Sequence, residues 1–155
     1  MNVVIVDREP VPVAYLRHTG AYGPGIGEFW MNAVAPWMAT NNLMGRDRFG
    51  ISLDDPIVTK PTQCRYDACV EIPRGVTLPG AEEITIPGGR YAVTRFTGTG
   101  AEIGAAWGVF LGEALGSPGN RADPSRNVLE HYPRGAYFDP KTRIFSCELC
   151  LPLGS

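Results

Sequence analysis

Three stretches of this 155-residue chain recur in the same order about 78 residues further along. The matched segments are 17–20 with 95–98, 26–30 with 103–107, and the two stretches that end at Pro73 and Pro152. This spacing is longer than the units of about 20–50 residues that build solenoids and propellers. It therefore predicts two copies of one small module, at about 1–75 and 76–153, joined in a single domain over residues 1–153.

Each module is expected to contain one amphipathic helix. Apolar residues recur at intervals of three and four, which is the pattern of one face of an α-helix. The two stripes comprise Ile26, Phe29, Trp30, Ala33, Val34, Trp37 and Met38 in the first module, and Ile103, Ala106, Trp107, Phe110, Leu111, Ala114 and Leu115 in the second. Pro36 lies off the first stripe. Because proline interrupts the hydrogen bonds of a helix, we expect it to kink or divide the first helix.

Strand-like segments precede and follow each helix. They are 11–17, 49–53 and 64–72 in the first module, and 90–96, 128–132 and 144–151 in the second. Each module thus reads strand–helix–strand–strand. Two such modules related by a pseudo-twofold axis predict an α+β fold, a curved antiparallel sheet with both helices on one face and a central cleft. Junctions of this kind are common ligand sites.

The charge balance and the hydropathy argue against several classes of partner. The chain has 14 basic and 16 acidic residues, a net charge of −2, whereas direct nucleic acid binding requires a basic face. No apolar run approaches the ~18 residues of a membrane span. Residues 1–7 have no basic flank and end on Asp7, unlike a signal peptide. We therefore expect a cytoplasmic protein with no membrane partner.

The four cysteines raise the question of a metal site. Cys147 and Cys150 have a zinc-ligand spacing, whereas Cys64 and Cys69 are further apart. Residues three apart on a strand point to opposite faces, so Cys147 and Cys150 could not hold one ion together. We expect buried, inert thiols, with metal binding and redox chemistry as the alternatives, and we predict no metal and no cofactor.

The two modules differ in the strand that follows the helix. The first copy reads Phe-Gly-Ile-Ser-Leu at 49–53, and the second reads Val-Leu-Glu-His-Tyr at 128–132. Strand alternation places Glu130 and Tyr132 on one face and His131 on the other. A carboxylate in an apolar row is either solvated at a sheet edge or buried, and burial raises its pKa unless it is paired. A cation entering the cleft would supply the partner, and each aromatic face would attract it by about 0.5–2 kcal/mol.

An ordered set of short motifs covers nearly the whole chain. The set comprises Asp-Asp-Pro at 54–56, Arg-Tyr-Asp-Ala-Cys at 65–69, Ile-Pro-Gly-Gly-Arg-Tyr-Ala at 86–92, the helical Trp107, Leu-Glu-His-Tyr at 129–132 and a closing strand that ends at Pro152. It resembles the GyrI-like small-molecule-binding family, which also forms the effector-binding domains of AraC-type and MerR-type multidrug regulators. The resemblance implies the doubled fold and a cleft for bulky lipophilic cations and other drug-like molecules. It places the family's glutamate on Glu130 and its tyrosine on Tyr132.

Other aromatic residues are candidates for the walls of that cleft. Trp30 and Trp107 lie at equivalent points of the helical stripes and are either core residues or cleft walls, and the resemblance favours Trp107. Tyr15 and Tyr91 lie on the first strand of each module, and the sequence leaves their faces open. Phe110 reaches the cleft only if the second helix borders it, and packs in the core otherwise. For His18 and His131 we expect structural roles.

These observations predict a stand-alone module that binds aromatic, cationic small molecules, as in multidrug binding or sequestration. The resemblance leaves a hydrolase of electrophilic, cyclopropane-bearing natural products as the alternative. Glu130 would then orient or deprotonate water, with Glu71 or Glu148 as a second carboxylate. The third hypothesis is an inhibitor of DNA gyrase, although no protein-binding surface stands out and any protein partner is unknown. A transcription factor is disfavoured because the two modules leave no segment for a helix-turn-helix.

Overall fold

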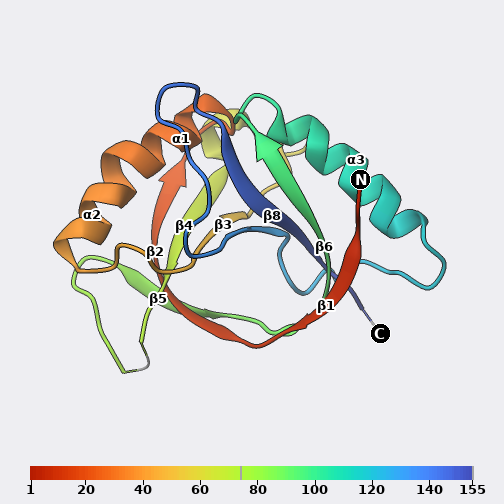
Figure 1. Ribbon diagram of the computed structural model, residues 1–155, viewed down its shortest axis with the longest axis horizontal. Helices are drawn as coiled ribbons and strands as arrows, with labels where there is room; N and C mark the ends of the chain where they lie inside the picture. The colour runs from red at the N-terminus through yellow and green to blue at the C-terminus, as the bar shows by residue number, and fades with distance from the viewer. Residues whose placement is uncertain (74, 155) are drawn as a thin grey trace.

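The computed structural model describes residues 1–73 and 75–154, which form one curled, eight-stranded antiparallel sheet with helices above it (Figure 1). The strands are β1 (Val4–Arg8), β2 (Val11–Thr19), β3 (Arg48–Ser52), β4 (Arg65–Glu71), β5 (Glu82–Ile86), β6 (Gly89–Gly98), β7 (Leu129–Tyr132) and β8 (Phe145–Pro152). The helical segments are α1 (Pro24–Phe29), the π-helix η1 (Trp30–Val34), α2 (Ala35–Thr40), the short 3-10 turn η2 (Pro61–Gln63) and α3 (Ile103–Gly116). The predicted α+β class is confirmed.

The strand order is symmetric about the middle of the sheet. The order is β1-β6-β8-β7-β3-β4-β2-β5, so the strands β6, β8 and β7 mirror β2, β4 and β3. The two halves join where β7 pairs with β3. This arrangement agrees with two strand–helix–strand–strand units, while their origin from a duplication stays a prediction.

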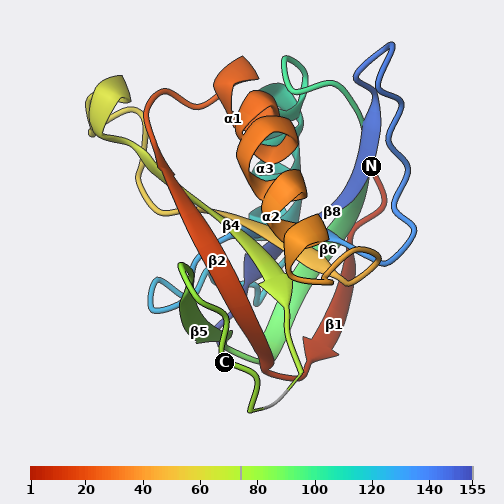
Figure 2. The same cartoon turned by 90° about the vertical axis from the view of Figure 1, so that its left-hand side faces the viewer.

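Both helices pack on the same face of the sheet, as predicted (Figures 1 and 2). On the first half, α1, η1 and α2 cover apolar residues of β2 and β4, with Val34 and Met38 buried against Ala14 and Val70. On the second half, α3 buries Phe110 and Ala114. A third apolar cluster lies on the other face, which the curl encloses. The sheet therefore separates two environments, one beneath the helices and one inside the curl.

Pro36 shapes the first helix. Residues 24–40 form three consecutive helical pieces, and the middle one, η1, is a π-helix that ends just before the α2 turn containing Pro36. Proline has no N–H to donate, and its ring crowds the carbonyl of the residue four positions earlier. A π turn widens the backbone and is a known way to accommodate such a break. The helix is therefore continuous over residues 24–40, and a local π segment stands where a kink or a division was predicted.

The strands β1 and β5 were not expected from the sequence, and each pairs with a strand of the opposite half of the sheet. β1 precedes the first module in the chain yet pairs with β6 of the second, and β5 precedes the second module yet pairs with β2 of the first. The two connections cross at the foot of the curl (Figure 1). A Cβ on Gly88 would lie 2.6 Å from the Arg8 carbonyl oxygen, so the crossing requires glycine there.

Glycines on the outer side of α3 reduce its stability. Gly104, Gly108 and Gly112 recur every four residues, and a Cβ added at any of them would meet no atom within 4 Å. Gly108→Ala should therefore stabilise the protein by about 1 kcal/mol, because alanine loses less backbone entropy in a helix. Thermal unfolding should show a rise in Tm of roughly 2–4 °C. As the control, Ala105→Gly on the same exposed side should lower Tm; an unchanged Tm in both variants would contradict the prediction.

Candidate functional site

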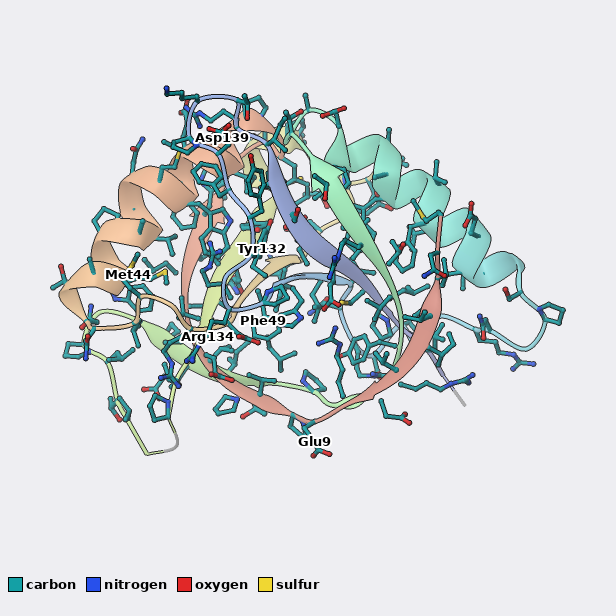
Figure 3. All side chains as sticks on the ribbon, in the orientation of Figure 1. Glu9, Met44, Phe49, Tyr132, Arg134 and Asp139 are labelled. Carbon is teal, nitrogen blue, oxygen red and sulfur yellow. The ribbon has the colours of Figure 1, made fainter. Side chains whose placement is uncertain are left out.

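Glu130 lies at the centre of the sheet, where the two halves meet. It pairs with Gly50 across the β7–β3 junction, and its side chain is on the face that carries the helices. Gly50 leaves room for its neighbours, because a Cβ there would overlap the Tyr66 hydroxyl and lie 2.8 Å from Glu130 Oε1. Figure 3 shows Tyr132 nearer the helices and Phe49 further towards the inside of the curl. The glutamate predicted from the asymmetry between modules is therefore at the junction, and Gly50 makes space for it.

Two tyrosines hold the carboxylate. The Tyr132 hydroxyl donates a hydrogen bond of 2.9 Å to Glu130 Oε1, and the Tyr66 hydroxyl donates one of 3.1 Å to the same oxygen. Trp30 Nε1 donates a 3.0 Å hydrogen bond to the Tyr66 oxygen and so orients that hydroxyl. Both tyrosine hydroxyls thus donate to the same carboxylate oxygen, Oε1.

Two opposing effects act on the pKa of Glu130. The residue is partly buried, and burial raises its pKa, whereas hydrogen bonding by Tyr132, Tyr66 and the Trp107 indole acts in the opposite direction. Burial and the nearby Glu130 charge raise the pKa values of Tyr66 and Tyr132, so both phenols stay neutral donors. Among the described residues, no arginine, lysine or histidine nitrogen lies within 4.0 Å of the Glu130 carboxylate.

Aromatic rings surround this carboxylate and also hold a cation of the chain. The rings of Trp30 and Tyr132 meet edge to face with centroids 5.7 Å apart, and the Phe145 ring lies 6.0 Å from that of Tyr132. The guanidinium carbon of Arg48 lies 5.2 Å from the Tyr132 centroid and 5.6 Å from that of Trp30. Cation–π attraction is expected at such distances. Arg48 is partly buried, and this burial lowers its pKa.

The structure brings together four of the seven predicted site residues. Glu130, Tyr132, Trp30 and Trp107 share the helix-bearing face. Of the other three, Tyr15 and Tyr91 pack with the cluster inside the curl. Phe110 is on the helix-bearing face but fully buried in the core there, with its ring centroid 5.8 Å from that of Trp107. Tyr91 instead donates a 2.7 Å hydrogen bond to the Pro87 carbonyl oxygen.

Three residues of the site were missed by the sequence analysis. Tyr66 was placed on a strand but given no role, and Arg48 and Gly50 were not considered as neighbours of Glu130. Arg48 and Gly50 share a face of β3 and pair with Tyr132 and Glu130, and alternation along a single strand does not specify that β3 and β7 become neighbours.

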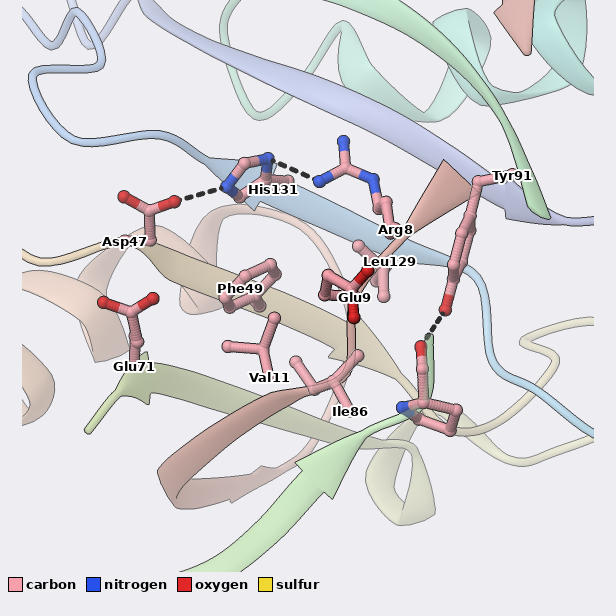
Figure 4. A pocket seen from close by; sticks show the side chains of 11 residues that line it. Arg8, Glu9, Val11, Asp47, Phe49, Glu71, Ile86, Tyr91, Leu129 and His131 are labelled. Atoms are coloured by element: carbon pink, nitrogen blue, oxygen red, sulfur yellow. Dashed lines mark hydrogen bonds and ion pairs between the residues drawn. The ribbon is translucent and has the colours of Figure 1, made fainter. Parts of the chain in front are cut away.

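A separate cavity of about 160 Å³ lies on the other face of the sheet (Figure 4). His131 lies there, as strand alternation predicted, with Nδ1 2.7 Å from Glu148 Oε1 and Nε2 2.9 Å from Asp47 Oδ2. Arg8 Nη2 donates to Glu148 Oε1 at 2.8 Å, and the His131 ring stacks on Phe49. The ring nitrogens of His131 thus have partners within the chain, which fits the structural role expected of this residue.

Neither described cavity of residues 1–73 and 75–154 is lined by Glu130. The second cavity, of about 270 Å³, is bordered by residues 133–137 and 146–148.

The cysteines Cys147 and Cys150 lie on opposite faces, as expected. Cys147 belongs to the cluster beneath α3, and Cys150 to the cluster inside the curl. Burial raises the pKa of Cys150 to about 12, and all four thiols are buried and unlinked. Such thiols are poor nucleophiles at neutral pH.

Within residues 1–73 and 75–154, no helix is both long and apolar enough to cross a membrane.

The structure is thus an α+β domain with a curled antiparallel sheet, helices on one face, and a carboxylate among aromatic rings at its centre. The chain belongs to the GyrI-like small molecule binding domain family, which matches residues 1–153. The predicted family membership is confirmed.

Similar proteins include regulators and a ligand complex. The chain is 30% identical over 115 residues to the SPbeta prophage-derived protein YosT of Bacillus subtilis, named as a candidate transcriptional regulator, and the match covers 73% of this chain and 77% of YosT. The C-terminal domain of EcmrR has the same fold, with a TM-score of 0.73, 12% identity and coverage of 99% and 98% of the two chains. SAV2435 bound to tetraphenylphosphonium gives a TM-score of 0.67 at 14% identity, with coverage of 100% and 95%. At these identities the two structures establish a shared fold.

Proposed function

We propose that this protein binds bulky aromatic cations at the Glu130 site. The observation that carries the proposal is a partly buried carboxylate that has hydrogen-bond donors but no ion-pair partner among the described residues. A buried charge without a counter-charge is costly, and a cationic ligand would offset that cost. Trp30 and Tyr132 add aromatic faces that attract cations.

The ligand class is also supported by a protein with the same fold. SAV2435 has been solved with tetraphenylphosphonium, a cation whose charge is surrounded by four aromatic rings. Such a ligand gains from apolar contact with Trp30 and Trp107 as well as from the charge of Glu130. Capture or sequestration of such molecules is the activity that we propose.

The hydrolase alternative has weaker support at this site. A second carboxylate would strengthen it, yet Glu71 and Glu148 both lie on the other face of the sheet, away from Glu130. A single glutamate with a raised pKa could still act as a base. Turnover of a cyclopropane-bearing electrophile that disappears in Glu130→Gln would favour hydrolysis over binding alone.

Glu130→Gln should weaken the binding of tetraphenylphosphonium at least tenfold. Glutamine keeps the shape and a hydrogen-bond acceptor but removes the charge. Tetraphenylphosphonium has no hydrogen-bond donor, so the loss is Coulombic: two unit charges about 5 Å apart attract by about 3 kcal/mol at an effective dielectric constant of about 20, and a tenfold change in Kd needs about 1.4 kcal/mol. Titration followed by tryptophan fluorescence, with calorimetry as a second measurement, gives the Kd. Glu113→Gln on the exposed side of α3 removes the same charge far from the site and should leave the Kd unchanged.

The pH dependence adds a second check on the same residue. Burial raises the pKa of Glu130 above its ordinary value of 4.5, so acidification should weaken cation binding at pH values above 4.5. In Glu130→Gln this loss of affinity on acidification should be absent. Equal Kd values for the wild-type protein and Glu130→Gln would refute the proposed function.

A further inference from the structure

Arg48 occupies the aromatic faces beside Glu130 without an anionic partner. Its guanidinium lies over both Trp30 and Tyr132, at 5.6 and 5.2 Å from the ring centroids. Among the described residues, no carboxylate oxygen lies within 4.0 Å of its nitrogens, and its side chain makes none of the described hydrogen bonds. Aromatic contact is therefore what holds this charge in place.

The position of Arg48 on the sheet is what brings it there. Arg48 pairs with Tyr132 across the β3–β7 junction, one step along the face from the Gly50–Glu130 pair. Its side chain thus shares the helix-bearing face with Glu130. A ligand cation that reached Glu130 over Trp30 and Tyr132 would have to use the rings on which the guanidinium rests.

We propose that Arg48 is a displaceable internal occupant of the Glu130 site, which a cationic ligand must move aside in order to bind. This inference rests on the proposed function and adds the way in which the site selects its ligands.

Displacement favours one class of cation over another. A small hydrated cation gains little more from the rings than the tethered guanidinium does, so it competes poorly. A cation that carries several aromatic groups buries additional apolar area against Trp107 and Phe145 and so outcompetes Arg48. Because the guanidinium is partly desolvated in place, it regains water contact when it swings outward. The site should therefore bind bulky lipophilic cations and discriminate against compact polar ones.

Arg48→Met should increase the affinity for tetraphenylphosphonium about tenfold. Methionine keeps apolar contact with the rings but removes the competing charge, whereas Arg48→Lys should give a smaller change because it keeps a cation. Arg90→Met is the matched control. Arg90 is exposed on β6, and its side chain has no described ion pair or hydrogen bond, so its loss should change the Kd less than twofold.

A chemical complementation experiment separates occupancy from general charge repulsion. In Arg48→Ala, added ethylguanidinium should compete with tetraphenylphosphonium and reduce its apparent affinity, while in the wild-type protein it should have little effect. Affinity that is unchanged or lower in Arg48→Met, together with Glu130-dependent binding in the wild type, would overturn the role of Arg48 and leave the proposed function standing. Absence of binding in the wild type, Arg48→Met and Arg48→Ala alike would overturn both.

Discussion

Replacing Gly50 with alanine should destabilise the protein by about 3 kcal/mol and weaken cation binding. The new Cβ would overlap the Tyr66 hydroxyl and come within 2.8 Å of Glu130 Oε1, and Tyr66 is only 2% exposed, so it has little room to move. Overpacking of a core position costs roughly 1–3 kcal/mol, and each buried polar group left unsatisfied adds about 1–3 kcal/mol. Urea unfolding measures the first effect, and titration with tetraphenylphosphonium the second.

A double substitution tests whether the overlap with Tyr66 is the cause. Tyr66→Leu removes the hydroxyl and the ring carbon that the new Cβ would meet. Gly50→Ala should then be much less destabilising in the Tyr66→Leu background than in the wild type. Equal costs in both backgrounds would exclude the overlap with Tyr66 as the cause, and Gly50→Ala with wild-type stability would contradict the described packing altogether.

Acidification should remove stability that depends on Glu148, on the face of the sheet opposite Glu130. His131 and Arg8 stabilise the carboxylate and lower its pKa to about 2, from an ordinary value of 4.5. Because the pKa is lower in the folded state, this stabilisation is present above pH 4.5 and is lost as the pH falls towards 2. The shift corresponds to up to about 3 kcal/mol at neutral pH.

Glu148→Gln should therefore unfold more easily at neutral pH and lose much less stability between pH 4.5 and 2 than the wild type. Unfolding in urea at several pH values gives both quantities. The control is Glu71→Gln, because Glu71 pairs with Arg46 at 3.4 Å and its side chain is 39% exposed. Exposed pairs contribute about 0–1 kcal/mol, so that variant should change little. A Glu148→Gln protein with wild-type acid sensitivity would exclude Glu148 as the source.

Most of the fold could be predicted because it depends on local periodicity. The two helices were found from apolar residues at intervals of three and four, and the six strands of the two modules from alternation at intervals of two. Such spacing is visible within a single segment of the chain. The strands β1 and β5 were not found in this way, because each is an edge strand whose partner lies in the opposite half. Such pairing depends on the crossing of two connections at Gly88 and Pro10, a long-range contact with no local signature.

The site could be predicted only in part, for a similar reason. Alternation along one strand separates Glu130 and Tyr132 from His131, and the structure agrees. Alternation does not state which strands become neighbours, and so Tyr66 and Arg48 were missed. Tyr15 and Tyr91 were named as candidates although the sequence did not determine which face of its strand each side chain occupies. The structure places both inside the curl.

The sequence by itself determined that the chain forms two similar units with helices on one face of a sheet, since repeated apolar spacing specifies which side of each element is buried. It also singled out Glu130, because a carboxylate breaks an otherwise apolar row. Only the tertiary structure decided what surrounds that carboxylate. Pairing of β3 with β7 sets Gly50 beside Glu130 and Arg48 beside Tyr132. Trp30, from the helix of the first half, contacts Tyr66 and Arg48 at this junction. Contacts between segments distant in the chain arise from packing, and no spacing within a single segment encodes them.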